Sequence, residues 1–241
     1  SQRSTMKVLV TLASSHLSLE IASSLRGSHE VRLTDKNEVS TDLEIVRSDL
    51  GHGAPTNELV RGMNAIVHSG EIDPAASVSD QLDYQMRCTY NLLWSAAEEG
   101  VQRFIYLSSL RLMDGYDPDL AVTERWKPLP TTNVSVLCYH LGEMICREFA
   151  RENKISVVIL RLGDIESEKV AKTAISTSTL YMDDAALAIE KALGADHSGW
   201  LDIYHIQSVV PNARYLTGQP WWSADDVSPS FNLGYEPRAR S

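Results

Sequence analysis

The most constraining feature of this chain is a regular alternation of apolar, β-branched runs with segments that have a helical hydrophobic period. KVLVT at 7–11 is typical of a buried strand, and Leu17, Ile21 and Leu25 then recur every four residues, as on one face of a helix. The expected strands span residues 7–11, 29–35, 43–50, 65–70, 103–109, 155–162 and 199–206. The expected helices span residues 17–25, 56–63, 80–100, 135–153 and 182–195.

Strands that alternate with helices pair in parallel, because each crossover returns the chain to the same end of the sheet. The alternation therefore predicts an α/β fold, a doubly wound parallel sheet of about seven strands with helices on both faces. A hydrophobic content of 43% in 241 residues is enough for one sizeable core. We expect a single domain, 1–241, whose last stretch, 207–241, has an irregular pattern.

The formal net charge of −10 predicts an acidic surface, which disfavours general binding to nucleic acid or to anionic membranes. No apolar run reaches the roughly 18 residues of a membrane span, and SQRST before Met6 lacks the apolar core of a signal peptide. We therefore expect no nucleic-acid or membrane partner and a cytoplasmic location, with an organellar stroma or matrix as the alternative.

The three cysteines do not form a pattern of disulfides or metal ligands. Cys88, Cys138 and Cys146 include no CxxC pair, and no two histidines have metal-ligand spacing. We expect buried free thiols, a reducing compartment and no metal site. His68, at the end of an expected strand, is expected to be a packed or hydrogen-bonded residue.

Several stretches together resemble one family, the extended or atypical short-chain dehydrogenase/reductases of the NAD-dependent epimerase/dehydratase type. They are MKVLVT, SDL at 48–50, AIVHSG, TYNLLWSAAEEGVQRFIYLSS, Tyr139 opening a helix, and VVILRLGDI. The resemblance covers about residues 6–206, and LGYEPR near the end is similar to that family's C-terminal tail. It implies a single Rossmann-like domain that binds NAD or NADP.

In this family a long segment after the RLGDI stretch builds the substrate-binding lobe. Here only residues 166–180 precede the next helix start, so the resemblance implies a reduced C-terminal lobe and a small ligand. Residues 207–241 would be a C-terminal tail or a small substrate-side lobe. Its aromatic residues Trp221, Trp222 and Phe231 either cap the core or offer a patch to a protein partner.

The resemblance also implies a cofactor-binding turn after the first strand. In the family a Gly-x-x-Gly-x-x-Gly turn lets the backbone approach the cofactor's pyrophosphate. Those positions are Leu12, Ser15 and Ser18 here, and all three carry a Cβ. Leu12 is the largest departure, since its branched side chain stands in the tight turn. Ser15 begins a helix that still offers free N–H groups to an anion.

Three further residues match the family's adenosine-binding positions. Asp35 closes the second strand, where an acid binds the adenosine ribose hydroxyls and disfavours a 2′-phosphate. A solvated turn aspartate is the alternative for Asp35. Asp49 and Leu50 match a pair that lies near the adenine, and an ordinary strand-end turn is their alternative.

The family's chemistry uses a serine or threonine, a tyrosine and, four residues after the tyrosine, a lysine. Ser109 and Tyr139 match the first two groups, but Glu143 stands at the lysine position. Because Tyr139 and Glu143 are four apart on one helix, the carboxylate is expected to face the phenol and to raise its pKa. We expect Glu143 to pair with Arg147, its own neighbour one turn further on.

Two polar residues near these positions have weaker support. Gln85 stands where the family often has an asparagine, and it is expected on the helix surface. Arg111, two residues after Ser109, is either an anion-binding cation or an ordinary surface arginine.

These observations leave two functions open. The first is a homologue without hydride-transfer activity, a pseudoenzyme that binds a nucleotide-like ligand or a protein. The alternative is an active NAD(P)-dependent epimerase/dehydratase or reductase acting on a small carbonyl or sugar-nucleotide substrate, with Ser109 and Tyr139 carrying the chemistry. By resemblance, we also expect a homodimer through the helices near 80–100 and 135–153.

Overall fold

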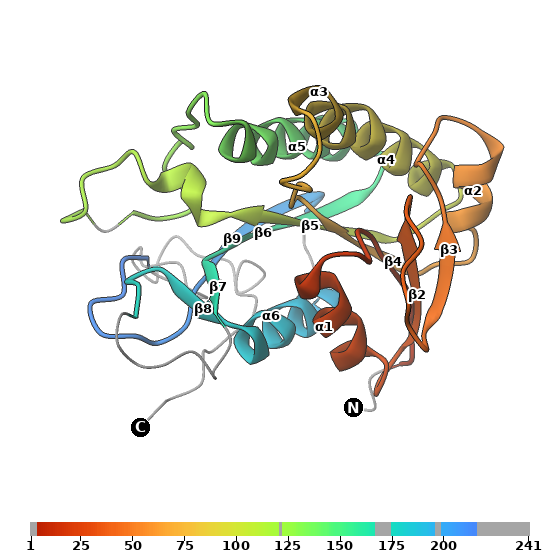
Figure 1. The fold of residues 1–241 in the computed structure, drawn as a ribbon, viewed down its shortest axis with the longest axis horizontal. Coiled ribbons are helices and arrows are strands. Elements are labelled where there is room, and N and C mark those ends of the chain that lie inside the picture. Colours follow the sequence, from red (N-terminus) through yellow and green to blue (C-terminus); the bar gives the residue numbers. More distant parts are fainter. Residues whose placement is uncertain (1–3, 121, 167–174, 196–198, 216–241) are drawn as a thin grey trace.

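The computed structural model describes residues 4–120, 122–166, 175–195 and 199–215, and it confirms the expected α/β class (Figure 1). The strands of the main sheet are β1 (Lys7–Val10), β2 (Glu30–Asp35), β3 (Glu44–Arg47), β4 (Ala65–Ser69), β5 (Arg103–Ser109), β6 (Ser156–Leu162) and β9 (Leu201–Ile206). Their order is β3-β2-β1-β4-β5-β6-β9, and all neighbours pair in parallel. The strand order reverses between β1 and β4, the place where open α/β sheets bind ligands.

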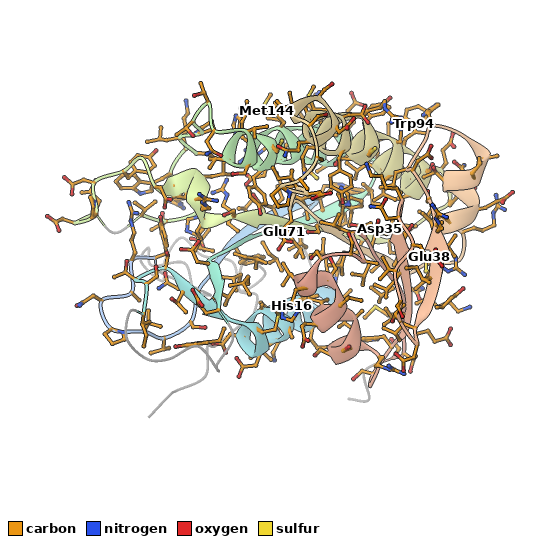
Figure 2. All side chains as sticks on the ribbon, in the orientation of Figure 1. His16, Asp35, Glu38, Glu71, Trp94 and Met144 are labelled. Atoms are coloured by element: carbon orange, nitrogen blue, oxygen red, sulfur yellow. The ribbon has the colours of Figure 1, made fainter. Side chains whose placement is uncertain are left out.

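Helices cover both faces of this sheet, as the alternation predicts. They are α1 (His16–Leu25), α2 (Ala54–Val60), α3 (Val78–Asp83), α4 (Thr89–Glu98), α5 (Val134–Arg151) and α6 (Met182–Gly194). α1 packs beside α6 on one face, and α4 packs beside both α2 and α5 on the other (Figure 1). His16 therefore belongs to the first helical layer, whereas Trp94 and Met144 belong to the second (Figure 2).

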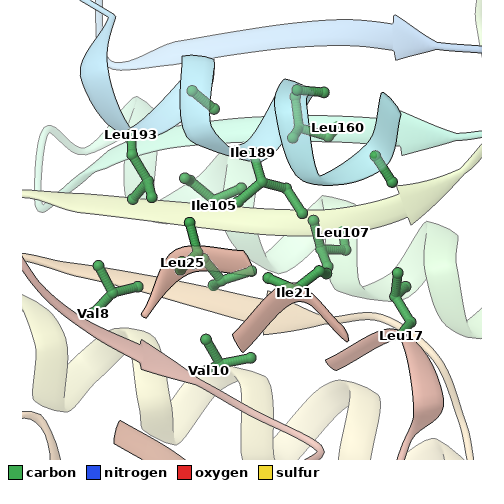
Figure 3. Packing of buried hydrophobic residues seen from close by; sticks show 14 of the residues in the cluster. Val8, Val10, Leu17, Ile21, Leu25, Ile105, Leu107, Leu160, Ile189 and Leu193 are labelled. Carbon is green, nitrogen blue, oxygen red and sulfur yellow. The ribbon is translucent and has the colours of Figure 1, made fainter. Parts of the chain in front are cut away.

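The core between the sheet and the first helical layer explains why apolar residues recur every four positions in α1. Leu17, Ile21 and Leu25 are all buried and contact β1, β5 and α6 side chains, including Ile105 and Ile189 (Figure 3). Full burial of such a side chain contributes about 1.5–3 kcal/mol to folding. The apolar period of α1 is thus satisfied by packing on the sheet.

The helix expected at 80–100 forms as three consecutive pieces. α3 passes into the π-helical turn η1 (Tyr84–Cys88), which passes into α4. Gln85 lies in η1, and the prediction that it is a surface residue is wrong, because the side chain is fully buried. Its Nε2 donates to the Gly70 carbonyl at 2.6 Å, and its Oε1 accepts from the Tyr106 hydroxyl at 2.9 Å. The π-turn thus contributes a buried amide that ties this helix to β4 and β5.

Beyond β6 the chain forms a small second sheet that the sequence did not predict. β7 (Asp164–Glu166) pairs in parallel with β8 (Thr179–Tyr181), and each strand has only three residues. The 3-10 helix η2 (Leu110–Met113) follows β5 and packs against Tyr215, at the beginning of the stretch 207–241. Trp221, Trp222 and Phe231 lie outside the described residues.

The three cysteines and His68 are buried, as expected. Cys88, Cys138 and Cys146 are free and buried. His68 is fully buried between the hydroxyls of Thr11 and Thr89, each at 2.8 Å from a ring nitrogen. No helix in the part of the chain that the structure describes is long and apolar enough to cross a membrane.

Candidate functional site

A cleft of about 270 Å³ opens at the carboxyl ends of β1, β2 and β3. Small-molecule sites commonly have about 300–1,000 Å³, so this cleft has room for part of a nucleotide-sized ligand. Leu12, Asp35, Asp49 and Leu50 all line it, although they come from three separate loops. The structure therefore brings together four of the six residues that the sequence proposed for cofactor binding.

The turn between β1 and α1 keeps a glycine-like conformation without glycine. Leu12 has φ of 56°, in the left-handed region, and its carbonyl accepts a hydrogen bond from the Ser15 amide at 2.9 Å. For a residue with a Cβ this region costs roughly 1–2 kcal/mol. The first position of the expected turn is therefore strained, and other contacts must hold it.

Asp35 supplies those contacts from the end of β2. Its Oδ2 accepts from the Ser14 amide at 2.9 Å and from the Ser14 hydroxyl at 2.7 Å. Its Oδ1 accepts from the Asn37 amide at 2.8 Å. Asp35 is buried, so the alternative of a solvated turn aspartate is wrong.

Ser15 and Ser18, the other two turn positions, do not line the cleft. Ser15 is the N-cap of α1, and its hydroxyl accepts from the Ser18 amide at 3.2 Å. Ser18 is fully buried, and its Oγ has no hydrogen-bond partner among the described residues. The Ser15 side chain thus caps α1, and the Ser18 side chain is packed inside the protein.

Asp49 and Leu50 form the cleft wall beyond β3. Asp49 is exposed and accepts from the Gly51 amide at 3.1 Å. Leu50 is buried with φ of 51°, and its carbonyl accepts from Asn91 of α4 at 2.9 Å. The strand-end turn and the cleft wall are therefore the same structure.

The lining of the cleft carries a negative balance of charge. Two cations, Lys36 and Arg87, line it. Five aspartates also do: Asp35, Asp49, Asp73, Asp80 and Asp83. Arg87 is paired with Asp83 at 2.7 Å, so the balance disfavours an additional phosphate at this end of the cleft.

A second and smaller pocket, of about 40 Å³, lies beyond the switch point at the carboxyl ends of β5 and β6. Ser109 and Tyr139 both line it, together with Glu71 from the loop after β4. The Ser109 hydroxyl accepts from the Arg111 amide at 3.1 Å and so also begins η2. The structure therefore brings the expected hydroxyl and phenol to one pocket.

Tyr139 has a pKa well above its ordinary value of 10. Burial is the main cause, and the Glu71 carboxylate adds to it, whereas the exposed Arg111 guanidinium opposes it. The sequence predicted a carboxylate beside this phenol, but it assigned Glu143. Glu71 is the acid that acts on Tyr139 from within the pocket.

Glu143 points into the protein interior and not toward the pocket. It is buried and forms a two-pronged ion pair with Arg161 of β6, with Oε1–Nη2 at 2.8 Å and Oε2–Nε at 3.1 Å. The Ser108 hydroxyl donates to the same Oε2 at 2.5 Å. The expected partner Arg147 is 3.9 Å away and 41% exposed, so Arg161 is the principal partner.

Arg161 extends this network along the same face of the sheet, from Ser108 of β5 to His205 of β9. It is the largest fully buried side chain of the described residues. Its Nη1 contacts Met113 of η2 and lies 3.3 Å from Nε2 of His205 in β9. Burial and the neighbouring guanidinium hold the pKa of His205 well below its usual range, which keeps the imidazole neutral and able to accept.

Among the described residues, no group of three or more histidine, cysteine, aspartate or glutamate side chains is arranged so that it could hold a metal ion.

With this fold and these two pockets, the chain belongs to the NAD dependent epimerase/dehydratase family, which it matches over residues 14–210. Among known proteins it is similar to the uronate dehydrogenase of Pseudomonas putida, with 24% identity over 98% of this chain and 85% of that protein. The NAD-dependent glucose-6-phosphate dehydrogenase of Haloferax volcanii is 21% identical over 97% of this chain and 94% of that protein.

Solved structures show the same fold. The uronate dehydrogenase of Agrobacterium tumefaciens superposes with a TM-score of 0.82 at 21% identity, over 98% of this chain and 85% of that one. A mutant of that enzyme complexed with NAD gives a TM-score of 0.81 at 20% identity, over 98% of this chain and 86% of that one.

Three residues that line or support these pockets were not identified from the sequence. Ser14 lies inside the turn between two glycine positions, and Arg161 lies within an apolar strand run. An arginine in a buried strand was itself a signal, because such a charge requires a buried partner. Glu71 directly follows the AIVHSG strand, which would have placed it at the ligand-binding edge of the sheet.

The buried pair gives a test of stability. Arg161→Met leaves Glu143 without its charge partner, so the unfolding free energy should fall by about 3–5 kcal/mol in urea denaturation. Arg147→Met removes only the distant, exposed cation and should cost less than about 1 kcal/mol. The double variant Glu143→Leu/Arg161→Met should recover much of the loss. Equal losses for Arg147→Met and Arg161→Met would contradict the assignment of Arg161 as principal partner.

Proposed function

We propose that this chain binds NAD, with the adenosine end in the cleft beside β1, β2 and β3. The observation that carries this proposal is the convergence of Leu12, Asp35 and the Asp49–Leu50 turn on one cleft. Membership of the epimerase/dehydratase family supports it, as does the NAD complex of a structural relative.

The cleft fits the nucleoside end of the cofactor in its chemistry. Asp35 Oδ1 accepts a single hydrogen bond, from Asn37, and so has lone-pair capacity for a ribose hydroxyl. The aspartates that line the cleft repel the 2′-phosphate of NADP. NAD is therefore the cofactor that this lining favours over NADP.

A large side chain that fills the cleft should weaken NAD⁺ binding. Ala76 lines the cleft, so Ala76→Phe should weaken NAD⁺ binding by at least about tenfold in isothermal titration calorimetry. The neighbouring Ala75 is exposed and does not line the cleft, so Ala75→Phe should leave the affinity unchanged. Wild-type protein should also bind NAD⁺ at least about tenfold more tightly than NADP⁺. Equal affinities of the two alanine variants would place the nucleoside elsewhere.

For the reaction, we propose reduction of a small carbonyl compound at the pocket lined by Ser109 and Tyr139. Bound NADH supplies a hydride to such a carbonyl carbon. A phenol with a raised pKa remains protonated, so Tyr139 acts as the hydrogen-bond donor and acid toward the carbonyl oxygen. Ser109, at the mouth of the same pocket, orients that oxygen. The pocket volume of about 40 Å³ limits the substrate to a small group at this point.

A ligand-binding role without hydride transfer is the second candidate. The observation that favours it is the charge around Tyr139, where Glu71 raises the phenol pKa and residue 143 contributes a carboxylate bound to Arg161. Neither carboxylate stabilises a tyrosinate, so oxidation of an alcohol with Tyr139 as the base is disfavoured.

Turnover distinguishes the two candidates. Wild-type protein with NADH and a panel of small aldehydes, ketones and sugar-derived carbonyl compounds should oxidise NADH, followed at 340 nm. Tyr139→Phe should lower kcat/KM by about 10²–10⁴-fold, because the acid is lost. Tyr90→Phe, on the exposed face of α4, should have no effect. Tight NADH binding without turnover on the whole panel would favour the non-catalytic candidate.

We also propose a homodimer through the outer face of α3, η1, α4 and α5. Met86, Tyr90 and Trp94 recur every four residues on this face and are 46%, 42% and 39% exposed. Met144 of the neighbouring helix α5 is 50% exposed and lies in the same helical layer as Trp94 (Figure 2). The four side chains therefore offer an apolar surface to a second copy.

Charge on this surface should separate the two copies. Met86→Glu/Trp94→Glu should change the mass measured by light scattering from twice 26.8 kDa to 26.8 kDa. Val209→Glu introduces one charge at a 53% exposed valine after β9 and should leave the dimer intact. A wild-type mass of 26.8 kDa at micromolar concentration would contradict the dimer.

A further inference from the structure

The backbone at Glu71 is held at a fixed place beside the switch point. Gly70, the preceding residue, donates its amide to the Leu107 carbonyl at 2.9 Å. The Gln85 amide donates to the carbonyls of Gly70 and Glu71, at 2.6 and 3.3 Å. A Cβ at Gly70 would approach the Leu107 carbonyl to 2.5 Å and the Tyr139 ring to 2.8 Å, so this segment has no room to move inward.

The Glu71 side chain extends from this fixed backbone toward the N-terminus of α1. It lines the small pocket together with Leu17 of α1 and Tyr139 of α5. The carboxylate lies close enough to Ser15 and His16 for both residues to lower its pKa, and the Ser15 hydroxyl also accepts the N-capping bond from the Ser18 amide. Glu71 therefore lies beside the cap of α1.

The N-terminus of α1 is the position that the phosphates of a dinucleotide take in this fold, because free amide groups and the helix dipole favour an anion there. In this chain the Glu71 carboxylate lies beside that position, next to Ser15 and His16. A phosphate that enters the same space meets a like charge in a partly buried environment, where solvent screens the repulsion poorly.

We propose that Glu71 is a charge-selectivity residue, whose carboxylate weakens the binding of any ligand that places a phosphate at the N-terminus of α1. This assignment rests on the proposed binding of NAD in the adjacent cleft and names the part of the ligand that the site disfavours. Uncharged nucleosides escape the repulsion, because they occupy only the cleft beside β2 and β3.

The protonation state of Glu71 controls the strength of this effect. Burial raises the pKa of Glu71, whereas the hydrogen bond from Ser15 and the nearby His16 lower it. Tyr84 of η1 and Tyr139 of α5 face the same carboxylate, and both remain neutral because their own pKa values are raised. Arg111 and Asp164 act on the phenol of Tyr139 and offset each other in sign.

The sign of the pH dependence follows from this charge. A protonated Glu71 carries no repulsion, so a phosphate-bearing ligand binds with uptake of a proton. NAD⁺ affinity should therefore be highest at low pH and fall as the pH rises through the pKa of Glu71, which lies above the ordinary 4.5. Adenosine has no phosphate, so its affinity should not depend on this group.

Calorimetric titration of wild-type protein and Glu71→Gln with NAD⁺ and with adenosine, between pH 5.5 and 8, tests the assignment. At pH 8, Glu71→Gln should bind NAD⁺ at least about tenfold more tightly than wild type. Adenosine affinity should be equal in the two proteins. The pH dependence of NAD⁺ binding should be flatter in Glu71→Gln than in wild type.

Glu38→Gln is the matched control. It removes the same single charge from an exposed position after β2 that does not line the cleft, and it should leave NAD⁺ affinity at the wild-type value. Adenosine binding with identical NAD⁺ affinity in wild type and Glu71→Gln would overturn the charge-selectivity role alone. Failure of all three proteins to bind adenosine would overturn the proposed cleft and, with it, this assignment.

Discussion

The position of α5, the helix that carries Tyr139, depends on one buried ion pair. Arg161 and Glu143 join β6 to α5, and neither charge has access to solvent. Such a pair stabilises a fold only when its hydrogen bonds are complete, and here Ser108 and His205 supply the remaining partners. Because Glu143 follows Tyr139 by about one helical turn, the pair sets the rotation of α5 and so directs the phenol to the pocket.

Carboxylates hold this site together at three points. Asp35 fixes the turn after β1, Glu143 fixes α5, and Glu71 lies at the cap of α1. The first two contribute to structure through hydrogen bonds that leave the cleft open. Glu71 differs, because it lines the small pocket together with Tyr139. The scaffold of a dinucleotide-binding family is thus retained with an unusual charge at its central crevice.

The sequence predicted the seven-stranded sheet and the two helical layers because their apolar periods are strong and local. It failed where burial depends on distant partners. Gln85 has a polar side chain of the kind usually found on a protein surface. Its hydrogen bonds with the Tyr106 hydroxyl and the Gly70 carbonyl make its burial favourable. The pairing of Glu143 was assigned to Arg147 because helical spacing is visible in sequence, whereas the contact with Arg161 is not. β7 and β8 are too short to give a period.

The bonds between Asp35 and Ser14 also bear on the order in which this chain folds. Glycine lets a tight turn form from local preference alone, but the turn at Leu12 is held by a residue 21 positions beyond Ser14. Its closure must therefore wait until β2 has paired with β1, since a contact at that separation carries a loop-closure entropy cost. The cleft beside β1, β2 and β3 is consequently a late product of sheet assembly in this chain, completed after the strands that frame it.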